Sequence, residues 1–78
     1  MARYVDDVDD LLAKFKIAEV DDAAFPKYYG FAAPDGSWYV LMENTAPATF
    51  RYSRGDSGFA ANWTGRGSLT YDYIFNIF

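Results

Sequence analysis

The stretch "KYYGFAAPDGSWYVLMEN", residues 27–44, decides the fold of this chain. Its outer segments, 27–33 and 38–44, are rich in aromatic residues, which favour β-strands. Between them lies "PDGS", in which Pro34 fixes its backbone φ angle and Gly36 accepts a positive φ angle, as a tight turn requires. The pattern predicts an antiparallel β-hairpin.

Two further strands are predicted downstream of the hairpin. In "ATFRYSR", residues 48–54, apolar and polar side chains alternate with the period of two that a strand with one buried face shows. "LTYDYIFNIF", residues 69–78, again places apolar side chains at alternate positions and predicts the last strand of the sheet. The glycine-rich segment between these strands, residues 55–68, holds one short helical turn over 59–63, which Gly65 ends.

The first part of the chain predicts an amphipathic helix and a linker. Apolar side chains recur there at helical spacing, with aspartates beside them. This apolar stripe consists of Val5, Val8, Leu11, Leu12 and Phe15. An isolated helix of about a dozen residues is only marginally stable in water, so the stripe must contact either the chain's own sheet or another protein, and we expect the second. The sequence thus divides into an acidic helical arm with its linker, residues 1–26, and an aromatic-rich antiparallel β domain, residues 27–78.

The predicted fold class is α+β, mainly β. An N-terminal amphipathic helix precedes a small antiparallel sheet of about four strands, with one short helical turn before the last strand. The chain has 78 residues and no cysteine, so no disulfide supports the fold, but seven Tyr, seven Phe and two Trp supply large apolar side chains. These rings exceed what one face of a thin sheet covers, so part of the aromatic surface is predicted to meet another protein.

Charge and composition exclude several classes of function. The net charge is −4, and residues 1–26 carry this excess, so the acidic arm repels phosphates and no nucleic-acid partner is expected. Histidine and cysteine are both absent, which removes the commonest general base, thiol nucleophile and zinc ligands. We therefore expect no enzyme activity, no catalytic residue, no metal site and no cofactor. The apolar runs are too short to span a membrane, so no membrane partner is expected.

The order of residues between 28 and 73 resembles a family of small proteins encoded by tailed bacteriophages. The shared pattern is Tyr-x-Gly-x-Ala, then Trp-x-Val, then Phe-x-x-x-Trp-x-x-Arg-x-Ser-Leu-x-Tyr. Its structural positions here are Tyr28, Gly30, Trp38, Tyr52, Phe59, Trp63, Arg66, Leu69 and Tyr71. Such genes lie among virion structural genes. The resemblance therefore implies a minor structural protein of the neck, tail or capsid, made in the host cytoplasm and located in the virion.

The function expected from this resemblance is non-enzymatic contact with other virion proteins or with copies of itself, as an oligomer in the particle. Two alternatives stay open. The acidic arm suits a phage-encoded inhibitor that mimics nucleic-acid charge toward a host protein. Exposed Trp or Tyr rings suit a glycan-binding module.

For three side chains the sequence predicts a structural role, with a functional role as the alternative. For Trp38 and Trp63 we expect a core position, with the indole N–H bonded to a backbone carbonyl. Arg66 is expected to bind the carbonyls that end the helical turn, or to pair with an acid such as Asp72. A contact with a partner protein is the alternative for Arg66.

Overall fold

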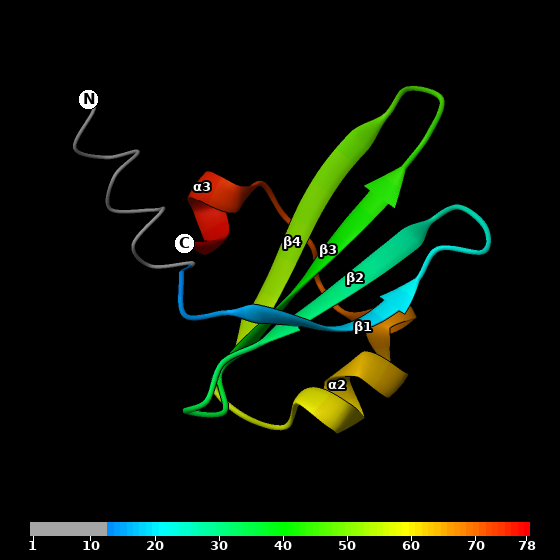
Figure 1. Ribbon diagram of the computed structural model, residues 1–78. Helices are drawn as coiled ribbons and strands as arrows, with labels where there is room; N and C mark the ends of the chain where they lie inside the picture. Colours follow the sequence, from blue (N-terminus) through cyan, green and yellow to red (C-terminus); the bar gives the residue numbers. More distant parts are fainter. Residues whose placement is uncertain (1–12) are drawn as a thin grey trace.

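The computed structural model describes residues 13–78, and the sheet that they form is a simple meander. Its strands follow one another in the order β1-β2-β3-β4, and each neighbouring pair is antiparallel (Figure 1). The strands are β1 (Lys16–Asp21), β2 (Lys27–Ala32), β3 (Trp38–Asn44) and β4 (Thr49–Gly55). The structure thus confirms a mainly β chain with a four-stranded antiparallel sheet.

The β2–β3 hairpin forms as its turn residues predict. Gly36 adopts a φ angle of 94°, and its amide donates a hydrogen bond to the carbonyl of Ala33. The Asp35 carboxylate accepts hydrogen bonds from the amide and the hydroxyl of Ser37, which is the local bonding that favours aspartate in turns. The two strands then pair without a break from Ala32↔Trp38 to Lys27↔Glu43.

Helix α2 (Phe59–Thr64) covers one face of the sheet (Figure 1). Phe59 and Trp63 are one helical turn apart, and both rings lie directly over Gly30. A Cβ atom at Gly30 would come within 2.8 Å of the Phe59 ring and 2.9 Å of the Trp63 ring. The helix ends at Gly65, so the predicted helical turn and its C-terminal glycine are confirmed.

Trp38, Val40 and Ser53 are buried on this covered face of the sheet, and Tyr39 is buried on the opposite face. Val40 is completely buried, and Trp38 is 3% exposed. The indole N–H of Trp38 donates a 2.7 Å hydrogen bond to the carbonyl of Ser57, so its polar group is satisfied. The expectation that Trp38 is a core residue bonded to the backbone is confirmed.

The C-terminal segment corrects the strand predicted over residues 69–78. Only Asp72 pairs with β4, through two backbone hydrogen bonds to Tyr52, of 2.7 and 2.9 Å. A 3₁₀ turn, η1 (Arg66–Ser68), precedes this bridge, and the short helix α3 (Ile74–Ile77) follows it. The Asp72 carboxylate accepts hydrogen bonds from the Tyr73 amide and the Asn76 side chain. These local bonds turn the chain into α3 and compete with a continued strand.

The first strand, β1, corrects the helix and linker predicted around it. Residues 16–21 pair along β2 rather than continuing a helix. The pairing sets Ile17 opposite Phe31 and Val20 opposite Tyr29, so cross-strand apolar contacts outweigh the local helical spacing. The other members of the predicted apolar stripe lie outside the described residues: Val5, Val8, Leu11 and Leu12.

Candidate interaction surface

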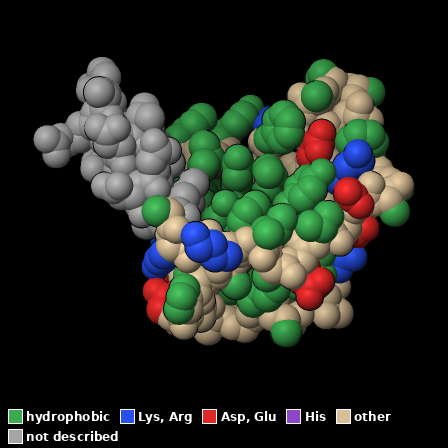
Figure 2. Space-filling view, viewed as in Figure 1, with side chains coloured by type: hydrophobic (Ala, Val, Ile, Leu, Met, Phe, Trp, Pro, Cys, Tyr) green, Lys and Arg blue, Asp and Glu red, His purple; other side chains and the backbone are tan. Residues whose placement is uncertain are grey.

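We name the sheet face opposite α2 the aromatic face. Because residues directly paired across strands lie on the same face, its side chains form three cross-strand rows. These rows are Ile17–Phe31–Tyr39–Arg54, Val20–Tyr29–Leu41–Tyr52 and Lys27–Glu43–Phe50. Figure 2 shows hydrophobic side chains gathered in a continuous area over the strands.

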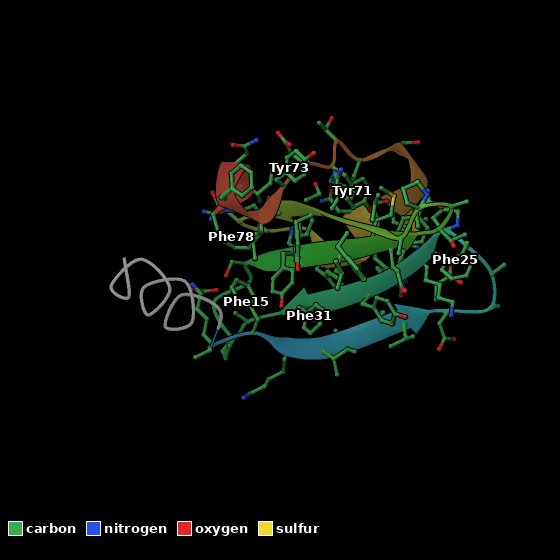
Figure 3. The ribbon with its side chains drawn as sticks, turned by 90° about the horizontal axis from the view of Figure 1, so that it is seen from above. Phe15, Phe25, Phe31, Tyr71, Tyr73 and Phe78 are labelled. Atoms are coloured by element: carbon green, nitrogen blue, oxygen red, sulfur yellow. The ribbon has the colours of Figure 1, made fainter. Side chains whose placement is uncertain are left out.

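Aromatic rings pack around Tyr39 at one end of the aromatic face. Phe31 stacks on Tyr39 with 4.5 Å between ring centroids, while Phe15 and Phe78 meet it edge-on at 5.1 and 5.5 Å. Figure 3 shows Phe15, Phe31 and Phe78 at the same end of the sheet. Burial raises the pKa of the Tyr39 hydroxyl. This end of the aromatic face is therefore closed by the chain itself, and Phe15 of the predicted apolar stripe belongs to it.

The remainder of the aromatic face meets solvent. Ile17 is 57% exposed, Val20 49% and Phe50 50%. Tyr29 and Leu41, between them, are half-buried. Covering apolar surface of this kind is favourable by about 25 cal/mol per Å². A contiguous exposed apolar area on a small protein is typical of a site that binds another protein.

Polar groups border the aromatic face at the end away from Tyr39. Tyr29 donates its hydroxyl to the Glu43 carboxylate at 3.3 Å. Lys27, opposite Glu43, places its ammonium 4.7 Å from the centre of the Phe25 ring. An apolar centre with a polar border is the usual anatomy of a protein–protein interface.

A cleft of about 320 Å³ opens beside the closed end of the aromatic face. Its lining includes Lys14, Asp35, Ser37, Arg54 and Asp56. Lys14 pairs with Asp35 at 2.9 Å, and both side chains are exposed. Hydrogen bonds from Ser37, followed by the one from Lys14, hold the pKa of Asp35 far below its ordinary value. The cleft thus carries both signs of charge, and its cation–anion pair is satisfied within the chain.

Arg66 forms a clamp between α2 and β1 on the covered face. Its guanidinium lies 4.5 Å from the centre of the Trp63 ring and 5.7 Å from that of Tyr28. It donates two hydrogen bonds to Asp21, of 3.2 and 2.7 Å, and one of 2.9 Å to the Trp63 carbonyl. The predicted bond to the end of the helical turn is confirmed. The acidic partner is Asp21, at the end of β1, rather than Asp72.

Tyr71, Leu69 and Tyr52 also belong to the sequence pattern that resembles phage proteins. Tyr71 donates its hydroxyl to the Arg66 carbonyl at 2.8 Å, and burial raises its pKa. Its ring lies 6.1 Å from that of Tyr28. Leu69 follows η1 in an extended conformation. Tyr52 lies in the second row of the aromatic face and bonds to Asp72 through its backbone.

The two tryptophans lie against other side chains. Trp38 is buried, and Trp63 contacts the Phe59 ring, at 6.0 Å between centroids, and the Arg66 guanidinium. Trp63 is half-buried, so the core position expected for it is not confirmed as it is for Trp38.

The sequence did not identify Ile17 and Val20 as part of this surface. The register of β1 shifts between Ile17 and Glu19, with Ala18 as the extra residue of a β-bulge. Because of the bulge, two residues three apart in sequence share one face, as they would on a helix. The signal available was the β-branched side chains of both residues, which favour strands.

Comparisons with protein-family models, with curated proteins and with solved structures found no match. The likeness to phage proteins therefore rests on the sequence pattern alone. Within residues 13–78, acidic side chains do not gather in threes as a metal site would need. The helices of the same range are too short and polar to cross a membrane.

Proposed function

We propose that this protein is a non-enzymatic structural component of a tailed phage particle and that it acts through its aromatic face. The observation that carries the proposal is the exposure of about half of Ile17, Val20 and Phe50 on one continuous apolar surface. The resemblance of residues 28–73 to phage proteins supports the setting in a particle.

A partner that covers the aromatic face would gain affinity from the apolar centre of this face. The polar border of the face would fix the partner's orientation. Leu41 and Tyr29 lie at the centre of the rows, where water would be fully excluded. The Tyr29–Glu43 bond and Lys27 lie at the border, where charges select a partner more than they strengthen binding.

Quantitative mass spectrometry of density-purified particles tests the proposed function. Particles of the phage that encodes this chain should contain it in a fixed ratio to the major capsid protein. Absence from particles, with expression early in infection, would instead support an inhibitor that mimics nucleic-acid charge. Binding on a glycan array, without association with particles, would support the glycan-binding alternative.

A surface variant tests the role of the aromatic face in the same particles. Phe50→Asp places a charge on an exposed position, so the fold should persist while incorporation into particles falls at least tenfold. Ala60→Asp is the matched control, because Ala60 is an exposed residue of α2 on the other side of the sheet. Equal incorporation of the two variants would contradict the assignment of the aromatic face as the contact surface.

A further inference from the structure

The two edges of the sheet differ in what lies beside them. Beside β4, Asp72 forms two backbone hydrogen bonds with Tyr52, so the C-terminal segment occupies part of that edge. Beyond β1, the described part of the chain places no element (Figures 1 and 3). Residues 16–20 are all exposed. The outer backbone groups of an edge strand are a template for pairing with another strand.

The side chains of β1 on either side of the central pair Ala18–Glu19 follow a matching order. Ile17 and Val20 lie on the aromatic face, opposite Phe31 and Tyr29. Glu19 and Asp21 lie on the covered face, opposite Gly30 and Tyr28, and Lys16 lies there opposite Ala32. Beyond Ala18 and Glu19, the strand therefore reads in either direction an apolar side chain on the aromatic face and then a charged side chain on the covered face.

We propose that β1 pairs antiparallel with β1 of a second copy of this chain, about a twofold axis between Ala18 and Glu19. In this register Ile17 lies opposite Val20 of the second copy, and Lys16 lies opposite Asp21. Each of these four residues then meets a partner on its own face of the sheet. The two aromatic faces join into one surface across eight strands.

Charges and a bulge usually protect an edge strand from pairing. Here they match a partner, because Lys16 and Asp21 carry opposite charge and two equal bulges face one another at the axis. Both hydrogen bonds from Arg66 end on Oδ2 of Asp21, which leaves Oδ1 for Lys16 of the second copy. In a register shifted by one residue, Ile17 would lie opposite Glu19, and both the Ile17–Val20 pair and the Lys16–Asp21 pair would be lost.

Pairing of β1 describes how copies of the chain contact one another. It rests on the proposed function only in that several copies must be present together. It concerns an edge of the sheet and leaves the aromatic face free for another virion protein. Absence from phage particles would overturn the proposed function and leave the edge pairing intact. Failure of the edge pairing would leave membership of the particle intact.

Cysteine cross-linking tests the register directly, because the chain has no cysteine of its own. Full-length Ile17→Cys and Val20→Cys chains are mixed and oxidised. The proposed register puts these positions about 5 Å apart between Cα atoms, within reach of a disulfide. Two copies of the same position are about 10 Å apart along the strand and out of reach. Disulfides should therefore join unlike chains at least tenfold more than like chains. A statistical mixture, or like-chain disulfides only, would overturn the proposal.

Charge variants at the same two exposed positions give a second, reversible measurement. Ile17→Lys/Val20→Lys and Ile17→Glu/Val20→Glu each place like charges opposite one another, so each variant alone should sediment as a monomer. An equimolar mixture should form heterodimers, because every facing pair is then of opposite charge. Circular dichroism confirms that each variant is folded. Monomeric unmodified protein at millimolar concentration, or a mixture that stays monomeric, would overturn the proposal.

Discussion

Two glycines allow aromatic rings to lie directly on the backbone of the sheet. At Gly30 the rings of Phe59 and Trp63 occupy the space of a side chain, and a Cβ at Gly55 would lie 2.5 Å from the Trp38 ring. Rings therefore pack against backbone on the covered face, in a chain whose Tyr, Phe and Trp residues outnumber its Val, Ile and Leu residues. At the residue scale, stability depends on these close approaches and on a few hydrogen-bonded charges.

Gly30→Ala should lower the free energy of unfolding by about 1–3 kcal/mol, because the added methyl must displace two packed rings. Thermal melting followed by circular dichroism measures the change. Gly67→Ala is the matched control: nothing lies within 4 Å of a Cβ at Gly67, and loss of backbone freedom in the unfolded chain favours alanine there. Equal melting temperatures for the two variants would contradict the packing of α2 on Gly30.

Asp35 should make stability depend on pH in the acid range. Its pKa in the folded chain lies below the ordinary value of 3.8, first because of Ser37 and then because of Lys14. The unfolded chain therefore takes up the proton first, and the stabilisation present at neutral pH is lost as pH falls below about 4. Asp35→Asn should melt at a lower temperature than the unmodified protein at pH 7, with a smaller difference at pH 3.

The hydroxyl of Ser37 provides the control for this pH dependence. Ser37→Ala removes the largest cause of the lowered pKa but keeps the Asp35 carboxylate. The loss of stability between pH 5 and pH 3 should therefore become smaller in Ser37→Ala. A difference between Asp35→Asn and the unmodified protein that stays constant from pH 7 to pH 3 would refute the assignment.

At the scale of elements, local turn chemistry made some segments predictable and long-range pairing hid others. The β2–β3 hairpin follows from Pro34 and Gly36, because these residues act within four positions of sequence. Strand β1 was not predicted, because the bulge at Ala18 gives its apolar residues a helical spacing, and this spacing outweighed the β-branched side chains of Ile17 and Val20. The aromatic excess likewise predicted a contact surface, but without β1 the sequence did not show where that surface ends.

The Arg66 clamp joins elements that are far apart in sequence, so its loss should loosen α2 from β1. Arg66→Lys keeps the charge but loses the planar double hydrogen bond and the stacking on Trp63. The expected loss in unfolding free energy is about 1–3 kcal/mol, since the bonds to Asp21 are partly buried. Urea unfolding measures it. Arg54→Lys is the control, because Arg54 is exposed, and a loss as large as that of Arg66→Lys would count against the clamp.

At the scale of the molecule, the two faces of the sheet differ in how much of their apolar surface is covered by the chain itself. On the covered face Val40 and Trp38 are buried, and the Phe59 and Trp63 rings of α2 lie over Gly30. The aromatic face is closed only around Tyr39, by Phe15 and Phe78. A fold that leaves apolar side chains exposed on one face of its sheet is suited to assembly.

Folding and assembly can be separated experimentally at the junction of the apolar stripe and the sheet. Phe15→Ala should lower the free energy of unfolding by about 1–3 kcal/mol, because Phe15 packs edge-on against Tyr39 and is half-buried. Leu11, four residues earlier, lies outside the described residues, and the stripe predicts that it docks on another protein. Leu11→Asp should therefore keep the melting transition and lose association, as measured by light scattering. Loss of the transition itself in Leu11→Asp would mean that a charge had entered the chain's own core, and that the stripe packs within the molecule.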